Sequence, residues 1–176
     1  MAMAYRITIL CDNTVVALSG TLGEHDFAAL LEWDGGSLLF DTGQVPIRTT
    51  FEQGDAGIFC DEAGCAVDEV PDDQSLVIVT DRGLVLLLGC CHAGLVNTIE
   101  HARDKTGIED VYAVIGGTHL GFSDPAQLDA TVKALRGYRI SKLCAGHCTG
   151  FAASARLLKE FPGRFQPAQV GFTIEF

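Results

Sequence analysis

Three histidines share one local context, and their side chains could bind a transition metal. His92, His119 and His147 each follow an apolar run that predicts a strand, and each comes after a Gly. Neutral imidazole is a ligand for zinc, iron, nickel and copper, and a preceding Gly lets the backbone turn sharply. A single strand-end histidine is more often a hydrogen-bonded structural residue. Three of them favour one shared metal site, provided that their strands are neighbours in a sheet.

The seven cysteines allow several interpretations. Residues 60–65 and 144–148 each begin and end with Cys, but neither segment has the paired Cys-x2-Cys spacing of a dedicated zinc site. Cys90 or Cys91, next to His92, could act as a nucleophilic thiol, although two adjacent strand-end cysteines are more often small buried hydrophobic residues. An odd number of cysteines in a chain without an export signal indicates reduced thiols and a cytoplasmic location.

Asp41 is the one carboxylate that an apolar run places at a strand end. It could orient a histidine ligand or a bound water. It could equally be a turn aspartate that accepts hydrogen bonds from the amides of Thr42 and Gly43, and the pattern alone favours this second interpretation. The sequence contains no phosphate-binding loop, dinucleotide fingerprint or Gly-x-Ser-x-Gly elbow.

Apolar runs separated by turn residues predict the elements that position these side chains. The first half contains two expected hairpins, whose strands cover residues 27–33 with 37–40 and 75–80 with 84–88. Further strands are expected at 5–10, 111–115, 142–145 and 170–176, helices at 95–105, 125–135 and 151–161, and a loop with one short strand at most at 45–73. This order predicts an α/β protein, or α+β in some schemes, with reactive side chains at strand ends.

Composition bounds the partners of the chain. The 176 residues are 48% hydrophobic and include 23 Asp and Glu against 12 Lys and Arg, a formal net charge of -11. Binding to nucleic acid or to an anionic membrane needs clustered cations, so neither partner is expected. The longest apolar runs are also too short to span a bilayer. A small-molecule substrate or ligand is the remaining expectation.

Several motifs, taken together and in order, resemble one branch of the metallo-β-lactamase superfamily. That branch comprises the 7,8-dihydropterin-6-methyl-4-(β-D-ribofuranosyl)aminobenzene-5'-phosphate synthase-like metal-dependent hydrolases. The resemblance covers nearly the whole chain. The motifs that carry it are Glu24-His25-x-Phe27-x-x-Leu30-Leu31, Leu39-Phe40-Asp41-Thr42-Gly43-Gln44, Asp72-Asp73-Gln74-x-Leu76, Gly89-Cys90-Cys91-His92-Ala93-Gly94-Leu95-Val96-Asn97-Thr98, Gly116-Gly117-Thr118-His119-Leu120 and His147-Cys148-Thr149-Gly150.

One departure from the family pattern is as informative as the match. The family places His-x-His-x-Asp-His soon after Asp-Thr-Gly, and this motif supplies most of its metal ligands. Here no His occurs between His25 and His92. The family pattern jumps near residues 44–45, where Val45-Pro46-x-Arg48 looks like a segment from farther downstream. We therefore predict a single domain, residues 1–176, with an internal deletion near 44–45.

The resemblance implies a metallo-β-lactamase-like αββα sandwich, incomplete in its N-terminal half. It also implies that His92 and His147, with His119 as a third, bind a divalent transition metal: zinc first, with iron or manganese as alternatives. Asp41 would support the site, and Asp41 and His92 would take part in catalysis. In the intact family, a metal-bound hydroxide would attack a phosphate ester, a lactone or a similar electrophile.

Two alternatives to an active hydrolase remain open. Loss of the His-x-His-x-Asp-His motif could leave a catalytically inactive remnant that binds a small molecule or a partner, or the cysteines could hold a structural metal. The deletion would also remove helices that cover the N-terminal strands. The apolar residues of these strands remain, namely Phe27, Leu30, Leu31, Leu38, Leu39 and Phe40. We therefore expect a homodimer or higher oligomer with residues 27–40 at or near its interface.

Overall fold

The computed structural model describes residues 4–11, 28–34, 36–41, 57–61, 64–68 and 73–176. His25, Phe27 and the predicted junction near residues 44–45 lie outside these ranges. The deletion therefore stays a prediction. None of the described helices is both long and apolar enough to cross a membrane.

An antiparallel sheet contains the N-terminal strands and the last strand, in the order β11-β1-β2-β3. Alternation dictates its two faces: Ile7, Ile9 and Leu31 are buried, whereas the neighbouring Arg6 is exposed and forms an ion pair with Glu175. The predicted hairpin of residues 27–40 is confirmed, since β2 pairs with β3 along their whole length. The strands are β1 (Tyr5–Cys11), β2 (Ala28–Trp33), β3 (Gly36–Asp41) and β11 (Thr173–Glu175).

The second sheet has the order β10-β9-β8-β7-β6 and carries the histidine loops. β6 pairs antiparallel with β7, and β7, β8, β9 and β10 are parallel to one another. All six residues of β7 are buried, as expected for a strand covered on both faces. The strands are β6 (Ser75–Thr80), β7 (Gly83–Leu88), β8 (Val111–Gly117), β9 (Ile140–Gly146) and β10 (Phe165–Pro167).

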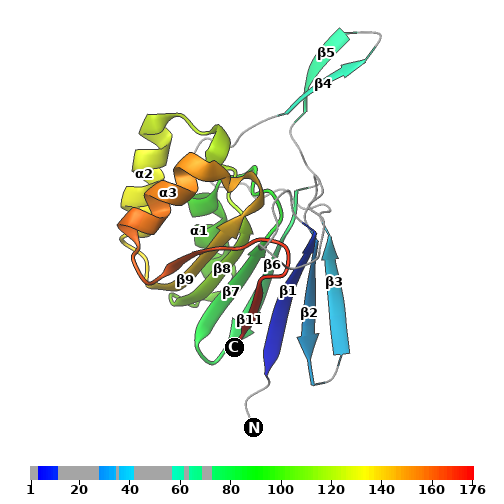
Figure 1. Cartoon of the computed structure of the whole chain (residues 1–176), viewed down its shortest axis with the longest axis vertical. Coiled ribbons are helices and arrows are strands. Elements are labelled where there is room, and N and C mark those ends of the chain that lie inside the picture. Colours follow the sequence, from blue (N-terminus) through cyan, green and yellow to red (C-terminus); the bar gives the residue numbers. More distant parts are fainter. Residues whose placement is uncertain (1–3, 12–27, 35, 42–56, 62–63, 69–72) are drawn as a thin grey trace.

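Three helices cover one face of the second sheet, and the first sheet covers the other (Figure 1). They are α1 (Leu95–Thr106), α2 (Pro125–Leu135) and α3 (Gly150–Glu160), with the 3-10 turns η1 (Leu120–Phe122) and η2 (His147–Thr149). The predicted capping residues are confirmed. At the start of α2, the Asp124 side chain accepts a hydrogen bond from the Gln127 amide at 2.8 Å, and at the end of α1, Gly107 has a left-handed conformation. The three expected helices are thus confirmed to within one residue at each end.

Two regions differ from the sequence prediction. Residues 45–73 were expected to hold one short strand at most, but the described part contains the hairpin β4 (Gly57–Asp61) and β5 (Gly64–Asp68). Each strand has only three residues between a Gly and an Asp, too few to show a period of two. β10 was not expected at all, because it is three residues long and contains Pro167. Proline is tolerated there since β10 is an edge strand.

Among the described residues, helices pack only on the second sheet, and none covers the outer face of the first. The described layers are therefore helix, sheet and sheet. This arrangement places the loops after β7, β8 and β9 side by side, because parallel neighbouring strands end at the same edge of a sheet.

Candidate metal centre

The three strand-end histidines lie in the loops after β7, β8 and β9, which are adjacent strands of one sheet. His92 follows β7, His119 follows β8, and His147 begins η2 directly after β9. The condition set by the sequence, that the three strands be neighbours, is therefore met.

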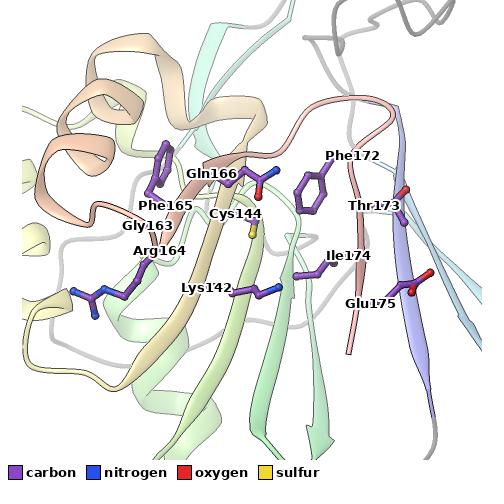
Figure 2. A pocket seen from close by; sticks show the side chains of 10 residues that line it. All are labelled: Lys142, Cys144, Gly163, Arg164, Phe165, Gln166, Phe172, Thr173, Ile174 and Glu175. Atoms are coloured by element: carbon purple, nitrogen blue, oxygen red, sulfur yellow. The ribbon is translucent and has the colours of Figure 1, made fainter.

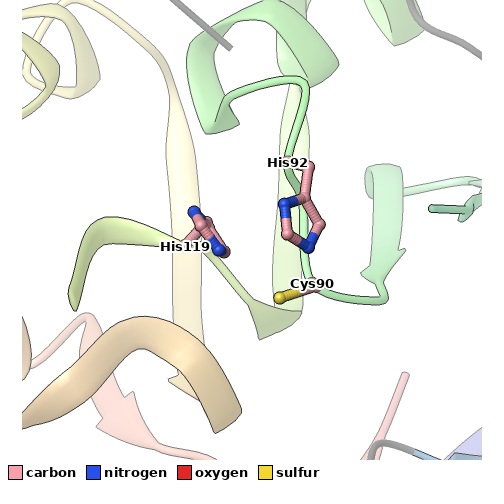
Figure 3. A group of neighbouring side chains, drawn as sticks. All are labelled: Cys90, His92 and His119. Carbon is pink, nitrogen blue, oxygen red and sulfur yellow. The ribbon is translucent and has the colours of Figure 1, made fainter. Parts of the chain in front are cut away.

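His92 and His119 lie together with a cysteine. Their ring centroids are 4.1 Å apart, and one donor atom each from Cys90, His92 and His119 all lie within 4.8 Å of one another (Figure 3). Cys90 extends from the loop after β7 towards the space between the two imidazoles. These three donors form the first potential metal-binding group.

His147 belongs to a second group. Donor atoms of Cys90, His147 and Cys148 also lie within 4.8 Å of one another. Within the described parts of the chain, the three histidines do not form one group at that separation; Cys90 is the residue common to both groups. The sequence had suggested Cys90 only as a nucleophile or a buried hydrophobic residue, so its position between two groups of ligands is a finding of the structure.

The side-chain carboxylate of Asp73, just before β6, holds the loop that carries Cys90 and His92. Asp73 Oδ1 accepts hydrogen bonds from the amides of Cys90 at 3.0 Å and Cys91 at 3.1 Å, and Asp73 Oδ2 accepts one from the His92 amide at 2.5 Å. Three donors on one carboxylate fix the path of the loop. Asp73 belongs to one of the motifs of the family resemblance, but no role for it follows from the sequence alone.

Three non-glycine residues of the site have positive φ angles. They are Cys91 at 68°, His119 at 54° and His147 at 50°, and within the described ranges no other non-glycine residue has a positive φ. Such left-handed conformations cost about 1–3 kcal/mol each and persist where the surroundings enforce them. Their concentration in these three loops supports a functional role for the arrangement.

Close backbone approach brings the loops together. A Cβ on Gly117 would lie 2.3 Å from the Gly89 carbonyl oxygen and 2.9 Å from the Cys148 sulfur, so only glycine fits there. The Cys148 thiol donates to the Cys90 carbonyl oxygen at 3.0 Å, and its sulfur accepts from the His119 amide at 3.1 Å. Cys148 therefore connects the loops after β7, β8 and β9.

The thiols of Cys90 and Cys148 influence each other's ionisation. Their shared side-chain hydrogen bond lowers the pKa of Cys148, with the nearby His147 contributing, and it raises the pKa of Cys90, which burial raises further. Cys148 is therefore the first of the two to become a thiolate. In contrast, burial raises the pKa of Cys144, in the core between the two sheets, to about 11.

The donors present fit a transition metal. Buried histidine nitrogens normally have hydrogen-bond partners, yet His92 Nδ1 is buried and has none among the described residues. Imidazole with thiolate is a typical donor set for zinc and is also used for iron. His92, His119, His147, Cys90 and Cys148 are the described residues that could hold such an ion.

Comparison with known proteins shows what this chain is similar to. No family model matches the sequence. The chain is 40% identical over 121 residues to the 7,8-dihydropterin-6-methyl-4-(β-D-ribofuranosyl)-aminobenzene-5'-phosphate synthase of Methanocaldococcus jannaschii, a match that covers 68% of this chain and 41% of the relative. It is 32% identical over 118 residues to the protein MJ0448 of the same organism, covering 66% of this chain and 42% of that one.

A solved structure decides the fold. The crystal structure of Tm1679, described as a metal-dependent hydrolase of the β-lactamase superfamily, superposes with a TM-score of 0.78 at 20% identity, covering 98% of this chain and 99% of that one. The chain has the metallo-β-lactamase fold. The resemblance inferred from the motifs is thereby confirmed, although the chain matches only about two fifths of the length of each curated relative.

Asp41 is the aspartate that the metallo-β-lactamase resemblance predicts as a support of the site, and the structure describes only its backbone. Asp41 is the last residue of β3, where its backbone pairs with Ala28. Its side chain lies outside the described part of the structure. The supporting role of Asp41 stays a prediction.

A hollow of about 550 Å³ lies beside His147 in this metallo-β-lactamase fold. Its wall includes Phe151 and Leu158 of α3, which are 91% and 54% exposed, and Gln169. On the other flank of the site, Phe122 stacks on the His119 ring with centroids 4.6 Å apart. Apolar and aromatic surfaces therefore border both ends of the histidine cluster.

A separate hollow of about 370 Å³ opens between β9, β10 and β11, at the edges of the two sheets (Figure 2). Lys142 and Cys144 line it from β9, Gln166 from β10, and Phe172 and Ile174 from the C-terminal segment. No histidine lines it. It is therefore distinct from the candidate metal centre.

Proposed function

We propose that this chain is a metal-dependent hydrolase of the metallo-β-lactamase superfamily, with His92, His119 and His147 as metal ligands. The observation that carries the proposal is that the three strand-end loops meet. His92 and His119 form one donor group with Cys90, and His147 forms the second donor group with Cys90 and Cys148. Zinc is the first choice of metal, and iron or manganese are alternatives.

Each residue of the site has a defined task in this proposal. When bound, a divalent metal would supply Lewis-acid activation of a phosphate ester or lactone-type substrate. His92 and His119 would hold the metal from the first donor group and His147 from the second. Asp73 fixes the loop of Cys90 and His92 through its three amide hydrogen bonds. The hollow beside His147 would receive the substrate. The 40% identical relative is named as the synthase of a compound that carries a 5'-phosphate, which supports a substrate with a phosphate group.

Metal content tests the proposal directly. We expect the purified chain, reconstituted with zinc, iron or manganese, to retain at least about one metal ion per chain. His92→Ala should lose most of it, because this residue has a buried nitrogen without a partner among the described residues. His101→Ala is the matched control, since His101 lies on α1 outside both donor groups. Elemental analysis that finds no metal after reconstitution would disprove the hydrolase proposal.

A binding module without catalysis is the second candidate function. The exposed Phe151 beside the hollow favours it, because a large exposed aromatic side chain often contacts a ligand or partner. If the chain is such a binding module, turnover of phosphodiesters, lactones and β-lactams should be absent or very low, because the His-x-His-x-Asp-His ligands are missing from the sequence. Robust turnover that a chelator abolishes would contradict that expectation and establish the hydrolase.

A further inference from the structure

Five donor atoms lie in the two groups, and two of them are sulfurs. The first group is Cys90, His92 and His119; the second is Cys90, His147 and Cys148. Cys90 is the member that they share. A ligand common to two groups can bind two metal ions at once, as a thiolate sulfur with several lone pairs is able to do.

We propose that Cys90 and Cys148 are metal ligands and that the Cys90 thiolate bridges two metal positions. This inference rests on the proposed function and extends it. His92 and His119 would complete the first position, and His147 with Cys148 the second. The two thiolates would thus take the place of ligands that the His-x-His-x-Asp-His motif supplies in the family and that this sequence lacks.

The separations are compatible with shared coordination. Zinc–sulfur bonds of about 2.3 Å and zinc–nitrogen bonds of about 2.0–2.1 Å put tetrahedral ligand atoms about 3.3–3.8 Å apart. The donors here lie within 4.8 Å of one another, so each group needs to contract by no more than about 1.5 Å around an ion. Rotation of cysteine and histidine side chains is sufficient for such a contraction.

The loop geometry selects Cys90 over its neighbour. Cys91 is 1% exposed, and its sulfur lies 3.4 Å from the Thr98 hydroxyl of α1, so it faces the helix. The positive φ of Cys91 and the hydrogen bonds to Asp73 hold the turn in which Cys90 instead faces the histidines. Two adjacent cysteines therefore have different tasks, one in the core and one in the site.

Cys148 is likewise held in place through its sulfur. The His119 amide donates to this sulfur at 3.1 Å, a contact that a thiolate accepts better than a thiol. Metal binding forms metal–sulfur bonds at Cys90 and Cys148, breaks the two S–H bonds and releases both protons to solvent. No electrons are transferred in this step, so no oxidant or reductant is needed.

Cobalt substitution tests the proposal on the whole chain. The apoprotein, kept reduced with a phosphine, is titrated with Co²⁺ while the near-ultraviolet sulfur-to-cobalt charge-transfer band is recorded. We expect the band to grow until about two cobalt ions are bound per chain. Cys90→Ser should leave about one third of the band, because it removes two of the three proposed cobalt–sulfur bonds, and Cys148→Ser should leave about two thirds.

Two cysteines provide matched controls. Cys91→Ser and Cys144→Ser should retain the full band, because Cys91 faces Thr98 and Cys144 lies in the core between the sheets. Circular dichroism checks that each variant is folded. The charge-transfer band of the wild-type protein tests for thiolate ligands even if a variant fails to fold. Cobalt that binds without a charge-transfer band would overturn the thiolate proposal and leave the histidine site intact. Saturation at a single cobalt with an unchanged Cys148→Ser spectrum would overturn the bridge. Failure of the wild type to bind cobalt would instead overturn the proposed function itself.

Discussion

Asp73 organises the candidate site without being one of its ligands. Its carboxylate accepts three amide hydrogen bonds from Cys90, Cys91 and His92. In Asp73→Asn, one acceptor oxygen becomes an NH2 group that faces an amide donor, and the negative charge is lost. We expect the free energy of unfolding to fall by about 2–3 kcal/mol, because hydrogen bonds to a charged group contribute about 1.5–3 kcal/mol. Chemical denaturation measures this change.

A second measurement separates a positioning role from a merely structural one. If Asp73 positions the loop, Asp73→Asn should also weaken zinc binding, by about 10- to 100-fold, as loss of residues that orient metal ligands usually does. Asp81→Asn, in the exposed turn between β6 and β7, is the control and should change neither quantity. Loss of stability with unchanged zinc affinity would show that Asp73 only supports the fold.

The residue types indicated the three histidines of the candidate site, whereas the cysteines were open to several interpretations: a nucleophile, buried hydrophobic residues or a structural metal site. A His after a strand and a Gly is a local pattern, so His92, His119 and His147 could be found from the sequence. Cys90 and Cys148 come together only because β7 pairs with β8 and β8 with β9, which brings their three loops to one place. A local sequence pattern contains no information on these pairings. The role of Asp73 depends on a contact across 17 to 19 residues and was equally hidden.

Gly117, at the end of β8, sets how closely the site-bearing loops approach. Its amide donates to the Gly89 carbonyl oxygen at 3.0 Å, and a Cβ there would come within 2.3 Å of that oxygen. Gly117→Ala should therefore push β8 away from the loop after β7. We expect a loss of about 1–3 kcal/mol in unfolding free energy, the usual cost of overpacking, together with weaker metal binding. Thermal unfolding with and without zinc measures both.

Gly137→Ala is the control for this prediction. A Cβ at Gly137 would meet only the Ala134 carbonyl oxygen, at 3.2 Å, and Gly137 lies beyond α2, away from the site. Its stability should change by less than that of Gly117→Ala, and its zinc affinity not at all. Equal effects of the two substitutions would show that the close approach at Gly117 is unimportant.

Elements with a strong local signal were predictable, and elements that depend on tertiary pairing were not. The hairpin of β6 and β7 and the helix α2 have turn and capping residues next to them, and their bounds match the sequence closely. β10 exists because it pairs with β9, and its three residues carry no period of their own. The sequence predicts a last strand over residues 170–176, but β11 is shorter. Gly171 has a positive φ that interrupts the extended segment, so the strand begins only at Thr173.

At the scale of the whole molecule, the first sheet carries exposed large apolar side chains on β1 and on β3. The buried alternate residues of β1 and β2 face the second sheet, whereas the outer face carries charged residues such as Arg6 and Glu175. The described outer face is therefore more polar than the sequence pattern had indicated. Leu38 of β3 is 43% exposed and Leu10 of β1 is 47% exposed. β3 is also an edge strand, and an uncovered edge can pair with another chain.

We propose that a second copy of the chain covers this edge, in a homodimer or higher oligomer that pairs near β2 and β3. Light scattering at micromolar concentration should then give at least twice the monomer mass. Leu38→Lys should shift the mass to that of a monomer, because a charge at an edge strand opposes pairing. Val79→Lys is the matched control: Val79 is 55% exposed on β6, the edge strand of the other sheet, and its substitution should leave the oligomer unchanged. A monomeric wild type would refute the proposal, since the β3 edge would then need no second chain in solution.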